Sequence, residues 1–447
     1  MKMKQYPKFI EDKNNLISVI NMSPSLPINW QTHKIKFLLR KPVTDGPHET
    51  PEFIDEGIPF LSVDSIQDGN LVFENCRYIS EEDHIRYKQK CNPKKNDVLM
   101  GKAASIGKIA IVDVDFEFST WSPLALLRPD TKKILPKFLE YSLKSDYCQD
   151  QIDLYATSNT QKNISMDEIP RIQIITPTIE EQSKEIDFLD SKTSQISKTI
   201  EADKKLIELL KEKRTALINH VVTKGLNPKA KMKYSGIEWI GEVPEGWEVG
   251  KLKYSCLINK KTLGEETNPQ LKINYLDISN VNNTGSIVST EELYFEDAPS
   301  RARRVPDQKD TIISTVRTYL KAIAYLDNIP DKLIVSTGFA VLHADKKIMP
   351  KFLFYVTSSE TFIQKVIADS TGVAYPAINP SDLGQIKIVL PSYPEQIQIA
   401  KYLDKATSKI DQTIKNIEEK IELLEEYKKS LIHHVVTGKV DVREAVA

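Results

Sequence analysis

The chain contains one long segment twice. Residues 177–223 match residues 391–437 without a gap, at an offset of 214 positions. Each copy opens with a proline and a Glu-Gln pair, continues with Leu-Asp and Thr-Ser-x-Ile, and ends with Leu-Ile-x-His-Val-Val-Thr. The same offset links residues 136–139 to residues 350–353, so the duplication extends further back. Two copies of one unit predict a molecule with two similar sites held at a fixed separation.

Both copies have apolar residues at alternating spacings of three and four. Roughly 43 residues at 1.5 Å each predict a helix about 65 Å long, and a sustained seven-residue period calls for a left-handed coiled coil. Thr193 and Arg214 interrupt the first seam, and Thr407 and Lys428 interrupt the second at matching places. The predicted apolar seam residues are Ile186, Leu189, Ile196, Ile200, Ile207, Leu210, Leu217 and Val221 in the first copy, and Leu403, Ile410, Ile414, Ile417, Ile421, Leu424, Leu431 and Val435 in the second.

Two such helices could also form an ordinary core hairpin of a helical bundle. A hairpin needs a short connection, but residues 224–390 separate the two copies and read as globular sequence. The helices can still pair with each other, in which case the intervening domain loops out from one end. Gly225 and Gly438 follow the two helices as stop signals.

The regions before each helix mix strand and helix patterns. Residues 57–66 and 273–281 alternate and are rich in β-branched residues, as strands are. The sequence therefore predicts an α+β chain of two αβ domains, each followed by a long helix, with the two helices packed as an antiparallel coiled coil. The predicted parts are an N-terminal extension (1–26), domain 1 (27–178), a central helix (179–224), an exposed linker (225–243), domain 2 (244–391), a C-terminal helix (392–438) and a tail (439–447).

The bulk composition is that of an ordinary globular protein. Of its 447 residues, 40% are hydrophobic and 28% are charged, with a net charge of −1. A DNA-binding protein of this composition must concentrate its positive charge locally. The sequence has no apolar run that predicts a membrane span, and its polar start predicts no secretory signal. The four scattered cysteines fit reduced thiols in the cytoplasm and do not suggest a metal site.

Four features together resemble the specificity (S) subunit of type I restriction-modification systems. They are residues 234–247 (Tyr-Ser-Gly-Ile-Glu-Trp-Ile-Gly-Glu-Val-Pro-Glu-Gly-Trp), the Asp-Gly-Pro-His run at 45–48, the paired Pro…Glu-Gln openings and the two Leu-Ile-x-His-Val-Val-Thr helix ends. Before domain 1 the chain departs from the family pattern, since only Pro27-Ile28-Asn29-Trp30 remains of the Pro-x-x-Trp motif. The family pattern is two target recognition domains, each followed by a helical spacer, with the spacers packed antiparallel.

The resemblance implies a non-catalytic DNA-recognition subunit that binds one asymmetric bipartite sequence of double-stranded DNA. It implies two methyltransferase (M) subunits and restriction (R) subunits as partners. S-adenosylmethionine, ATP and Mg²⁺ would belong to those partners, so no cofactor is expected here. A rigid helical pair agrees with this picture, because two readers on one face of B-DNA must lie about 34 Å apart. The two domains have diverged more than the helices, which predicts two different half-sites.

DNA contacts are predicted in loops that contain basic, amide and hydroxyl groups. Arginine and amide side chains read base edges, whereas lysine mostly neutralises phosphate. Asp45-Gly46-Pro47-His48 could be a recognition loop or merely a turn. The predicted DNA-binding residues are Lys102, Lys108, Asn159, Gln161, Lys162 and Asn163 in domain 1, and Arg301, Arg303, Arg304, Arg317, Lys321, Thr371 and Tyr375 in domain 2.

Two other classes of function fit the sequence less well. A self-contained modification enzyme is disfavoured, because Asn379-Pro380-Ser381-Asp382 is not the motif that holds an adenine amino group. The stretch 101–108 resembles a phosphate loop but is one residue too long, and Ile109 replaces the required Ser or Thr. The histidines His220, His433 and His434 lie at helix ends, where a partly charged imidazole suits the dipole. A coiled-coil scaffold with protein-binding domains would differ in lacking sequence-specific DNA affinity.

Overall fold

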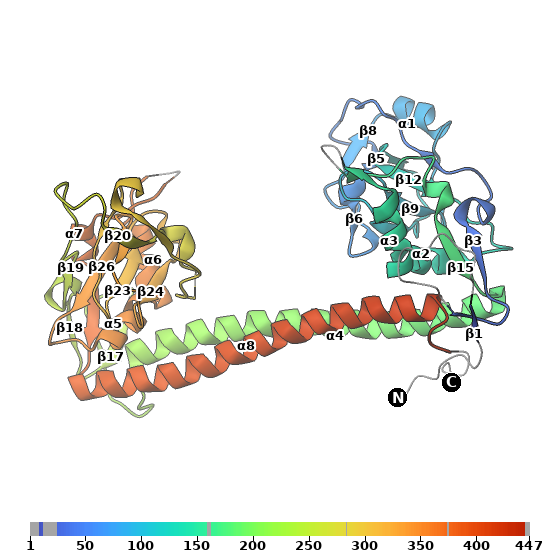
Figure 1. The fold of residues 1–447 in the computed structure, drawn as a ribbon. Coiled ribbons are helices and arrows are strands. Elements are labelled where there is room, and N and C mark those ends of the chain that lie inside the picture. Colours follow the sequence, from blue (N-terminus) through green and yellow to red (C-terminus); the bar gives the residue numbers. More distant parts are fainter. Residues whose placement is uncertain (1–8, 12–24, 159–161, 283, 373–374, 443–447) are drawn as a thin grey trace. The chain divides into compact units, whose positions relative to one another are not determined.

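A computed structural model describes residues 9–11, 25–158, 162–282, 284–372 and 375–442. The contacts divide the chain into two compact units: unit 1 is residues 1–203 with 419–447, and unit 2 is residues 204–418. Unit 1 is therefore discontinuous in sequence, because the last part of the chain returns to it. Each unit contains one αβ domain and one stretch of paired helix (Figure 1).

Unit 1 contains domain 1. Its strands are β1 (Phe9–Glu11), β2 (Ser25–Pro27), β3 (Gln31–Lys34), β4 (Thr44–Asp45), β5 (Ile58–Leu61), β6 (Ile66–Gln67), β7 (Asn70–Leu71), β8 (Arg77–Ile79), β9 (Val98–Gly101), β10 (Ile109–Ile111), β11 (Ser119–Thr120), β12 (Leu124–Leu127), β13 (Thr157–Ser158), β14 (Lys162–Asn163) and β15 (Gln173–Thr176). Its helices are α1 (Glu81–Lys88), α2 (Pro136–Lys144), α3 (Asp146–Tyr155), the first part of α4 (Ile179–Lys224) and the last part of α8 (Tyr393–Val436).

Unit 2 contains domain 2. Its strands are β16 (Met232–Tyr234), β17 (Glu242–Pro244), β18 (Glu248–Lys251), β19 (Cys256–Ile258), β20 (Lys272–Leu276), β21 (Glu291–Tyr294), β22 (Ala302–Arg304), β23 (Thr311–Ser314), β24 (Ile323–Tyr325), β25 (Leu333–Ser336), β26 (Phe339–Ala344) and β27 (Lys387–Leu390). Its helices are α5 (Pro350–Thr357), α6 (Glu360–Ala368), α7 (Pro380–Leu383), the last part of α4 and the first part of α8.

The two domains share one topology. The four-stranded sheet of domain 1 has the order β10-β9-β12-β4, and that of domain 2 has the matching order β24-β23-β26-β19. A parallel pair, β5 with β11, has its counterpart in β20 with β25. Strand β22 extends the second sheet of domain 2 and has no counterpart in the three-stranded sheet β11-β5-β8. The domains are therefore duplicates, as the sequence repeat predicts.

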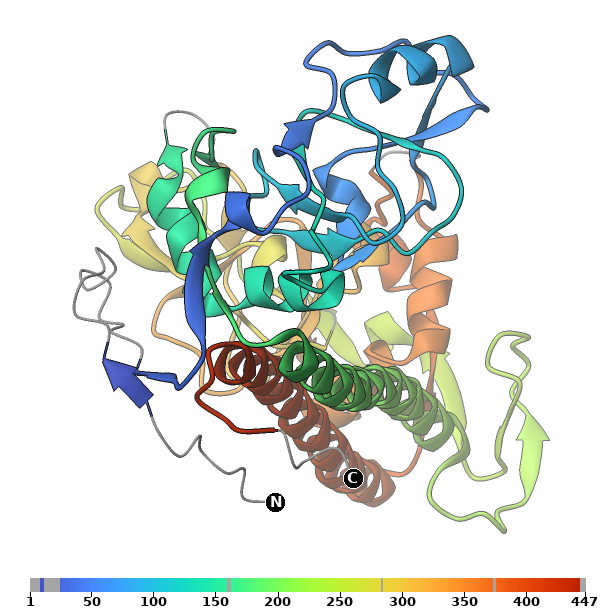
Figure 2. The same ribbon diagram turned by 90° about the vertical axis from the view of Figure 1, so that its right-hand side faces the viewer.

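The long helices pair in antiparallel fashion within each unit (Figure 2). In unit 2, Arg214 Nε lies 2.9 Å from Asp411 Oδ1. In unit 1, Lys428 Nζ donates to Ser197 Oγ at 2.8 Å. The first contact joins the end of α4 to the beginning of α8, and the second joins the beginning of α4 to the end of α8. The two contacts are equivalent under the sequence repeat, and they lie at the interrupted seam positions.

The predicted seam residues are buried or half-buried along both helices. Leu189 and Leu403 are fully buried, and Ile196, Ile207 and Ile410 are at most 9% exposed. Burial of such side chains supplies about 1.5–3 kcal/mol each. Because this stripe runs along both helices apart from a few polar positions, the helices obtain their stability from the pairing as well as from local propensity.

The repeated Glu-Gln pair joins each domain to its helix. Gln182 is fully buried; its Oε1 accepts a hydrogen bond from the Leu135 backbone N–H at 2.8 Å, and its Nε2 donates to two backbone carbonyl groups. Gln396 makes the same contacts, accepting from the Met349 N–H at 2.8 Å. The amide oxygen accepts a hydrogen bond from the backbone N–H of the residue that caps α2 or α5. The helix itself supplies no partner for that N–H group. This function explains why both copies keep glutamine.

A buried tyrosine completes each joint. The Tyr141 hydroxyl donates to Asp190 at 2.6 Å, and the Tyr355 hydroxyl donates to Asp404 at 2.7 Å. Burial, followed by the neighbouring carboxylate, raises the pKa of both tyrosines well above the usual value. Each domain is thus fixed to its own helix by the same set of polar contacts.

The predicted linker is exposed over many of its residues but is not exposed throughout. Residues 232–234 and 242–244 form the antiparallel pair β16–β17, and Ile237, Ile240, Val243 and Trp247 belong to the buried core of unit 2. The apolar residues are too widely spaced, between lysine and glycine, to produce a strand or helix period. Trp247 also donates its ring N–H to Glu395 at 3.1 Å, which fixes this segment to the start of α8.

Candidate nucleic-acid interface

The loop after the second sheet strand has two left-handed positions in both domains, although it is one residue longer in domain 2. In domain 1 it connects β9 to β10, and in domain 2 it connects β23 to β24. Ala104 and Gly107 have φ angles of 63° and 76°, and Arg317 and Lys321 have φ angles of 53° and 55°. A non-glycine residue in this left-handed region costs about 1–2 kcal/mol. Such strain clusters at functional sites, and here it recurs at the first left-handed position of each loop, Ala104 and Arg317.

A short hairpin lies against this loop in each domain. Thr157 pairs with Asn163 in domain 1, and Thr371 pairs with Ala377 in domain 2, at the repeat offset. The hairpin is bridged to the loop by Ala103 with Asn163 in one domain and by the equivalent residues of the other. The predicted residues Asn159 and Gln161 lie outside the described residues. Loop and hairpin together form one tip on each domain.

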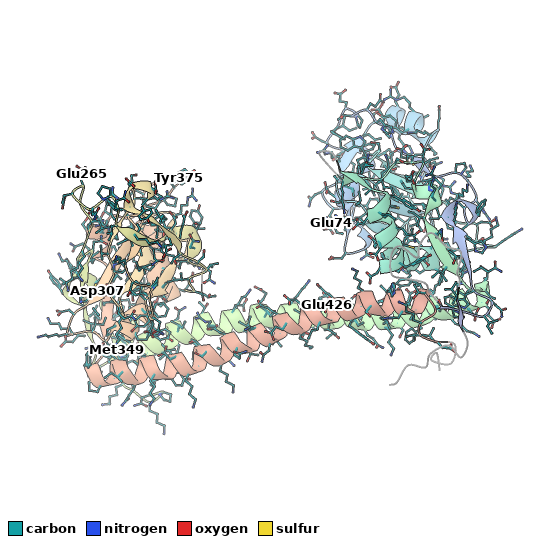
Figure 3. All side chains as sticks on the ribbon, in the orientation of Figure 1. Glu74, Glu265, Asp307, Met349, Tyr375 and Glu426 are labelled. Atoms are coloured by element: carbon teal, nitrogen blue, oxygen red, sulfur yellow. The ribbon has the colours of Figure 1, made fainter. Side chains whose placement is uncertain are left out.

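The tip of domain 2 brings three predicted residues together. The guanidinium carbon of Arg317 lies 4.7 Å from the ring centroid of Tyr375, whose side chain is 61% exposed. The Arg317 N–H donates to the Pro376 carbonyl oxygen at 2.8 Å, and Thr371 closes the base of the hairpin. In domain 2, Tyr375 lies far from the long helices, whereas Met349 lies beside them (Figure 3). Tyr319 and Leu320, in the same loop, are also exposed.

Acidic partners hold two other predicted cations of domain 2. Lys321 Nζ lies 2.8 Å from Glu360, and Arg301 Nη2 lies 2.7 Å from Asp277. The Arg301 side chain remains 59% exposed, and Thr337 donates its N–H to the Arg301 carbonyl oxygen next to the tip. These carboxylates neutralise part of the charge that either cation could offer to a phosphate group.

Arg303 and Arg304 are less accessible. The Arg303 guanidinium lies over the Phe295 ring at 4.7 Å. Arg304 is half-buried and donates to the Thr262 hydroxyl at 3.0 Å, and burial lowers its pKa. Both residues belong to β22, the strand without a counterpart in domain 1. The dense basic cluster of the sequence is therefore dispersed by the structure.

In domain 1 the structure places Lys102 inside the protein. It is 8% exposed and lies 3.2 Å from Asp45, which also accepts from Lys90 at 2.6 Å. Burial alone would raise the pKa of Asp45, but the two lysines outweigh it and hold that pKa below its usual value. A carboxylate 57 positions earlier draws Lys102 inward, which leaves little of the lysine accessible for the predicted DNA contact.

The Asp-Gly-Pro-His run begins in β4 and packs closely against residues 120–121. A Cβ atom on Gly46 would lie 1.7 Å from the Thr120 carbonyl oxygen, so the backbones approach at a distance that only glycine allows. Asp45 is buried, and His48 lies 3.1 Å from it. Of the four residues only His48 is exposed, so little of this run is free to act as a recognition loop.

Lys108, Lys162 and Asn163 surround the tip of domain 1. Lys108 is half-buried and lines a pocket with Gly69 and Lys144. Lys162 is exposed and lies 2.8 Å from Asp153, and Asn163 is exposed beside it. The structure places these three residues at or next to the loop and hairpin; their contact with DNA stays a prediction.

Sequence reasoning missed Arg77. It is exposed on β8, and its guanidinium lies 4.5 Å from the Phe53 ring centroid and 6.0 Å from that of Trp121. Among the described residues no carboxylate lies within ion-pair distance of it. An isolated arginine in a strand gives no local signal, since its aromatic neighbours are 24 and 44 positions away.

The resemblance of residues 101–108 to a phosphate loop is accidental. A phosphate loop leads into a helix, whose N-terminus binds the anion, but here the loop leads into strand β10.

The expectation of a partly charged imidazole fails for His433, because burial lowers its pKa to about 4. Within the part of the chain that the structure describes, no helix is long and apolar enough to cross a membrane.

Two αβ domains with repeated tips, each joined to one of two paired helices, define a two-site recognition protein. Comparison with known proteins gives the class a name. The chain belongs to the family described as type I restriction modification DNA specificity domain, which matches it twice, at residues 27–211 and 244–423. The family supplies DNA recognition and is not itself catalytic.

Relatives with this description span nearly the whole chain. A protein of Methanocaldococcus jannaschii, named for the type I restriction enzyme MjaX as its specificity subunit, is 28% identical over 432 residues, 94% of this chain and 95% of the relative. The MjaVIII specificity subunit of the same organism is 26% identical over 394 residues, 86% of each chain.

Solved structures show the same fold. A chain from a study of complex assembly and conformational transition of the type I restriction-modification system has a TM-score of 0.69 at 15% identity, covering 93% of this chain and 99% of the other. The specificity subunit HsdS of Thermoanaerobacter tengcongensis has a TM-score of 0.53 at 15% identity, covering 93% and 98%.

Proposed function

We propose that the two domains read separate halves of one asymmetric, interrupted sequence in double-stranded DNA. The observation that carries this proposal is the repeated tip: in both domains a loop with two left-handed residues is bridged to an equivalent hairpin, but the side chains differ. A common frame with different side chains suits two readers of unlike half-sites. Base edges specify sequence, whereas phosphate contacts set position.

The candidate contacts divide into groups that can read bases and groups that can bind phosphate. Arg317, Thr371 and Tyr375 in domain 2, and Asn163 in domain 1, offer groups able to read bases. Exposed lysines such as Lys162 offer charge to phosphate. Because the net charge is −1, binding depends on these local groups and weakens as salt rises. Arg77, held between two aromatic rings, is an added candidate in domain 1.

The outer surface of the long helices suits two copies of one partner. Leu209 and Leu423 occupy the same position of the repeat and are 52% and 65% exposed. Each has an exposed apolar neighbour on the same helix face, Leu206 or Tyr427. We infer that methyltransferase (M) subunits dock at both positions and that restriction (R) subunits join them. S-adenosylmethionine, ATP and Mg²⁺ then belong to those partners, and the assembly works in the cytoplasm.

A domain exchange tests the proposal. Residues 244–391 are replaced by the equivalent domain of a relative, and the chain is expressed with its methyltransferase partner. Sequencing of methylated DNA should show one half of the recognition sequence changed, with the other half and the spacing intact. The reciprocal exchange of residues 27–178 is the matched control and should change the opposite half. A change in both halves from one exchange would contradict separate reading.

A further inference from the structure

Arg317 differs from the other basic residues at the tip of domain 2. Lys321 and Arg301 are paired with Glu360 and Asp277. The Arg317 side chain lies over an exposed ring, and among the described residues no carboxylate lies within ion-pair distance of it. An exposed guanidinium that rests on an aromatic ring keeps its hydrogen-bond donors available in one plane.

The backbone presents this side chain at an energetic cost. Arg317 has a φ angle of 53°, which arginine rarely adopts. Two hydrogen bonds hold it there: its N–H donates to the Pro376 carbonyl oxygen, and its own carbonyl oxygen accepts from Leu320. The first bond ties the arginine to the hairpin that contains Tyr375. The loop therefore fixes the backbone of Arg317, and the Tyr375 ring supports its side chain.

The equivalent position of domain 1 presents only a methyl group. Ala104 has the same left-handed backbone, with a φ angle of 63°, in a loop of the same connection. Gly107 repeats the second left-handed position that Lys321 fills in domain 2. One frame therefore presents arginine in one domain and a methyl group in the other. This difference suits a position that specifies a base in one half-site alone.

We propose that Arg317 specifies a guanine in the half-site read by domain 2, with Tyr375 holding its guanidinium in the reading plane. The inference rests on the proposed function. Guanine presents two acceptors, O6 and N7, side by side in the major groove, and the arginine fork matches both. No other base offers that pair. Tyr375 acts as a positioning residue, because its ring restricts the fork to one orientation.

Methylation sequencing of variants tests the proposal in the assembled methyltransferase. Arg317→Gln and Arg317→Lys should each relax one guanine position of one half-site, by roughly 5- to 150-fold in preference for that base. Lysine keeps the charge but lacks the fork, so the two variants should resemble each other. The remaining bases, the other half-site and the spacing should stay unchanged.

Two further variants test the role of the ring. Tyr375→Phe keeps the ring and should keep the guanine preference, whereas Tyr375→Ala should weaken it at the same position. Lys253→Gln is the matched control, since Lys253 also lies over an exposed tyrosine, Tyr254, but at the opposite end of the sheet of domain 2. It should leave the methylated sequence unchanged.

Three outcomes would overturn the assignment. An unchanged sequence in Arg317→Gln would show that another group reads the base. Uniformly weaker methylation, with a shallower salt dependence of DNA binding, would make Arg317 a phosphate contact. Retained preference in Arg317→Lys would show that charge alone suffices. If the domain exchange still changes one half-site, these outcomes overturn the guanine assignment and leave modular reading intact.

Discussion

The two ends of each domain differ in how far the duplication has been kept. At the end next to the long helices, Gln182 and Gln396 make the same three hydrogen bonds. At the far end the loops keep their backbone form but present Ala104 in one domain and Arg317 in the other. The joints are constrained because each buried polar group must keep its hydrogen-bond partner in one arrangement. The tip side chains face solvent and can change without loss of the fold.

The difference also separates two kinds of substitution. A change at a joint or seam should alter stability in its own unit and should have an equal counterpart in the other unit. A change at a tip should alter recognition and have no counterpart. The predictions below compare equivalent positions in the two units, from the largest expected effect to the smallest.

The largest effect is expected at the helix seam. Leu189→Ala and Leu403→Ala remove equivalent, fully buried side chains, and each should cost about 2–5 kcal/mol of unfolding free energy. Hydrogen exchange should accelerate in the helix segments of unit 1 for the first variant and of unit 2 for the second. Leu209→Ala, at an exposed position, is the control and should change stability by less than about 0.5 kcal/mol. Equal loosening of both units by either variant would show that they unfold together.

A pH-dependent difference should follow at the helix ends. His433 is buried, and burial followed by the charge of Lys439 lowers its pKa to about 4. The unfolded chain, with a pKa near 6.5, binds the proton more readily, so this stability is complete above pH 6.5 and is lost as pH falls toward 4. Between pH 7 and pH 5 the loss should be about 2 kcal/mol.

The equivalent residue of α4 supplies the control. Asn219 accepts the Glu360 N–H at 2.7 Å and does not titrate. His433→Asn should therefore flatten the pH dependence of hydrogen exchange in residues 431–436, while residues 217–222 stay constant in both proteins. A pH dependence that survives in His433→Asn would show that His433 is not its source.

The smallest effect is expected at the glutamine joints. Gln182→Leu and Gln396→Leu keep the side-chain volume but leave a buried N–H without a partner, which costs about 1–3 kcal/mol. Chemical unfolding should show the same loss for both variants. Gln398→Leu, on the exposed side of α8, should have little effect. Unequal losses at the two joints would mean that one domain relaxes to satisfy the orphaned group.

The helices, the order of domains and the paired architecture could be predicted from the sequence. A heptad period over 40 residues is a strong local signal, and the offset of 214 positions transfers each feature from one copy to the other. The linker could not be predicted, because Ile237, Ile240 and Val243 enter a core built from distant residues. The pattern of a segment shows its own faces, not the surface it packs against.

The tips also depend on contacts between distant residues, which the sequence alone does not show. The basic and amide residues of the loops mark Arg317 and Tyr375 as candidates, but the sequence does not show that they meet, since 58 positions separate them. Lys102 and Lys108 look alike in sequence. Only the fold buries the first against Asp45 and leaves the second half-exposed. Side-chain pairing across long separations depends on the assembled sheet.

The split composition of unit 1 has a consequence for biosynthesis. Its residues 1–203 leave the ribosome early, but the helix segment 419–436 that covers the α4 seam is made only after the whole of unit 2. At about 5–20 residues per second, the interval between these segments is on the order of 10–40 s. During that time the apolar stripe of residues 186–203 has no α8 segment to pack against. A chain truncated before residue 419 therefore leaves an apolar helix face exposed, which chaperones and proteases can recognise.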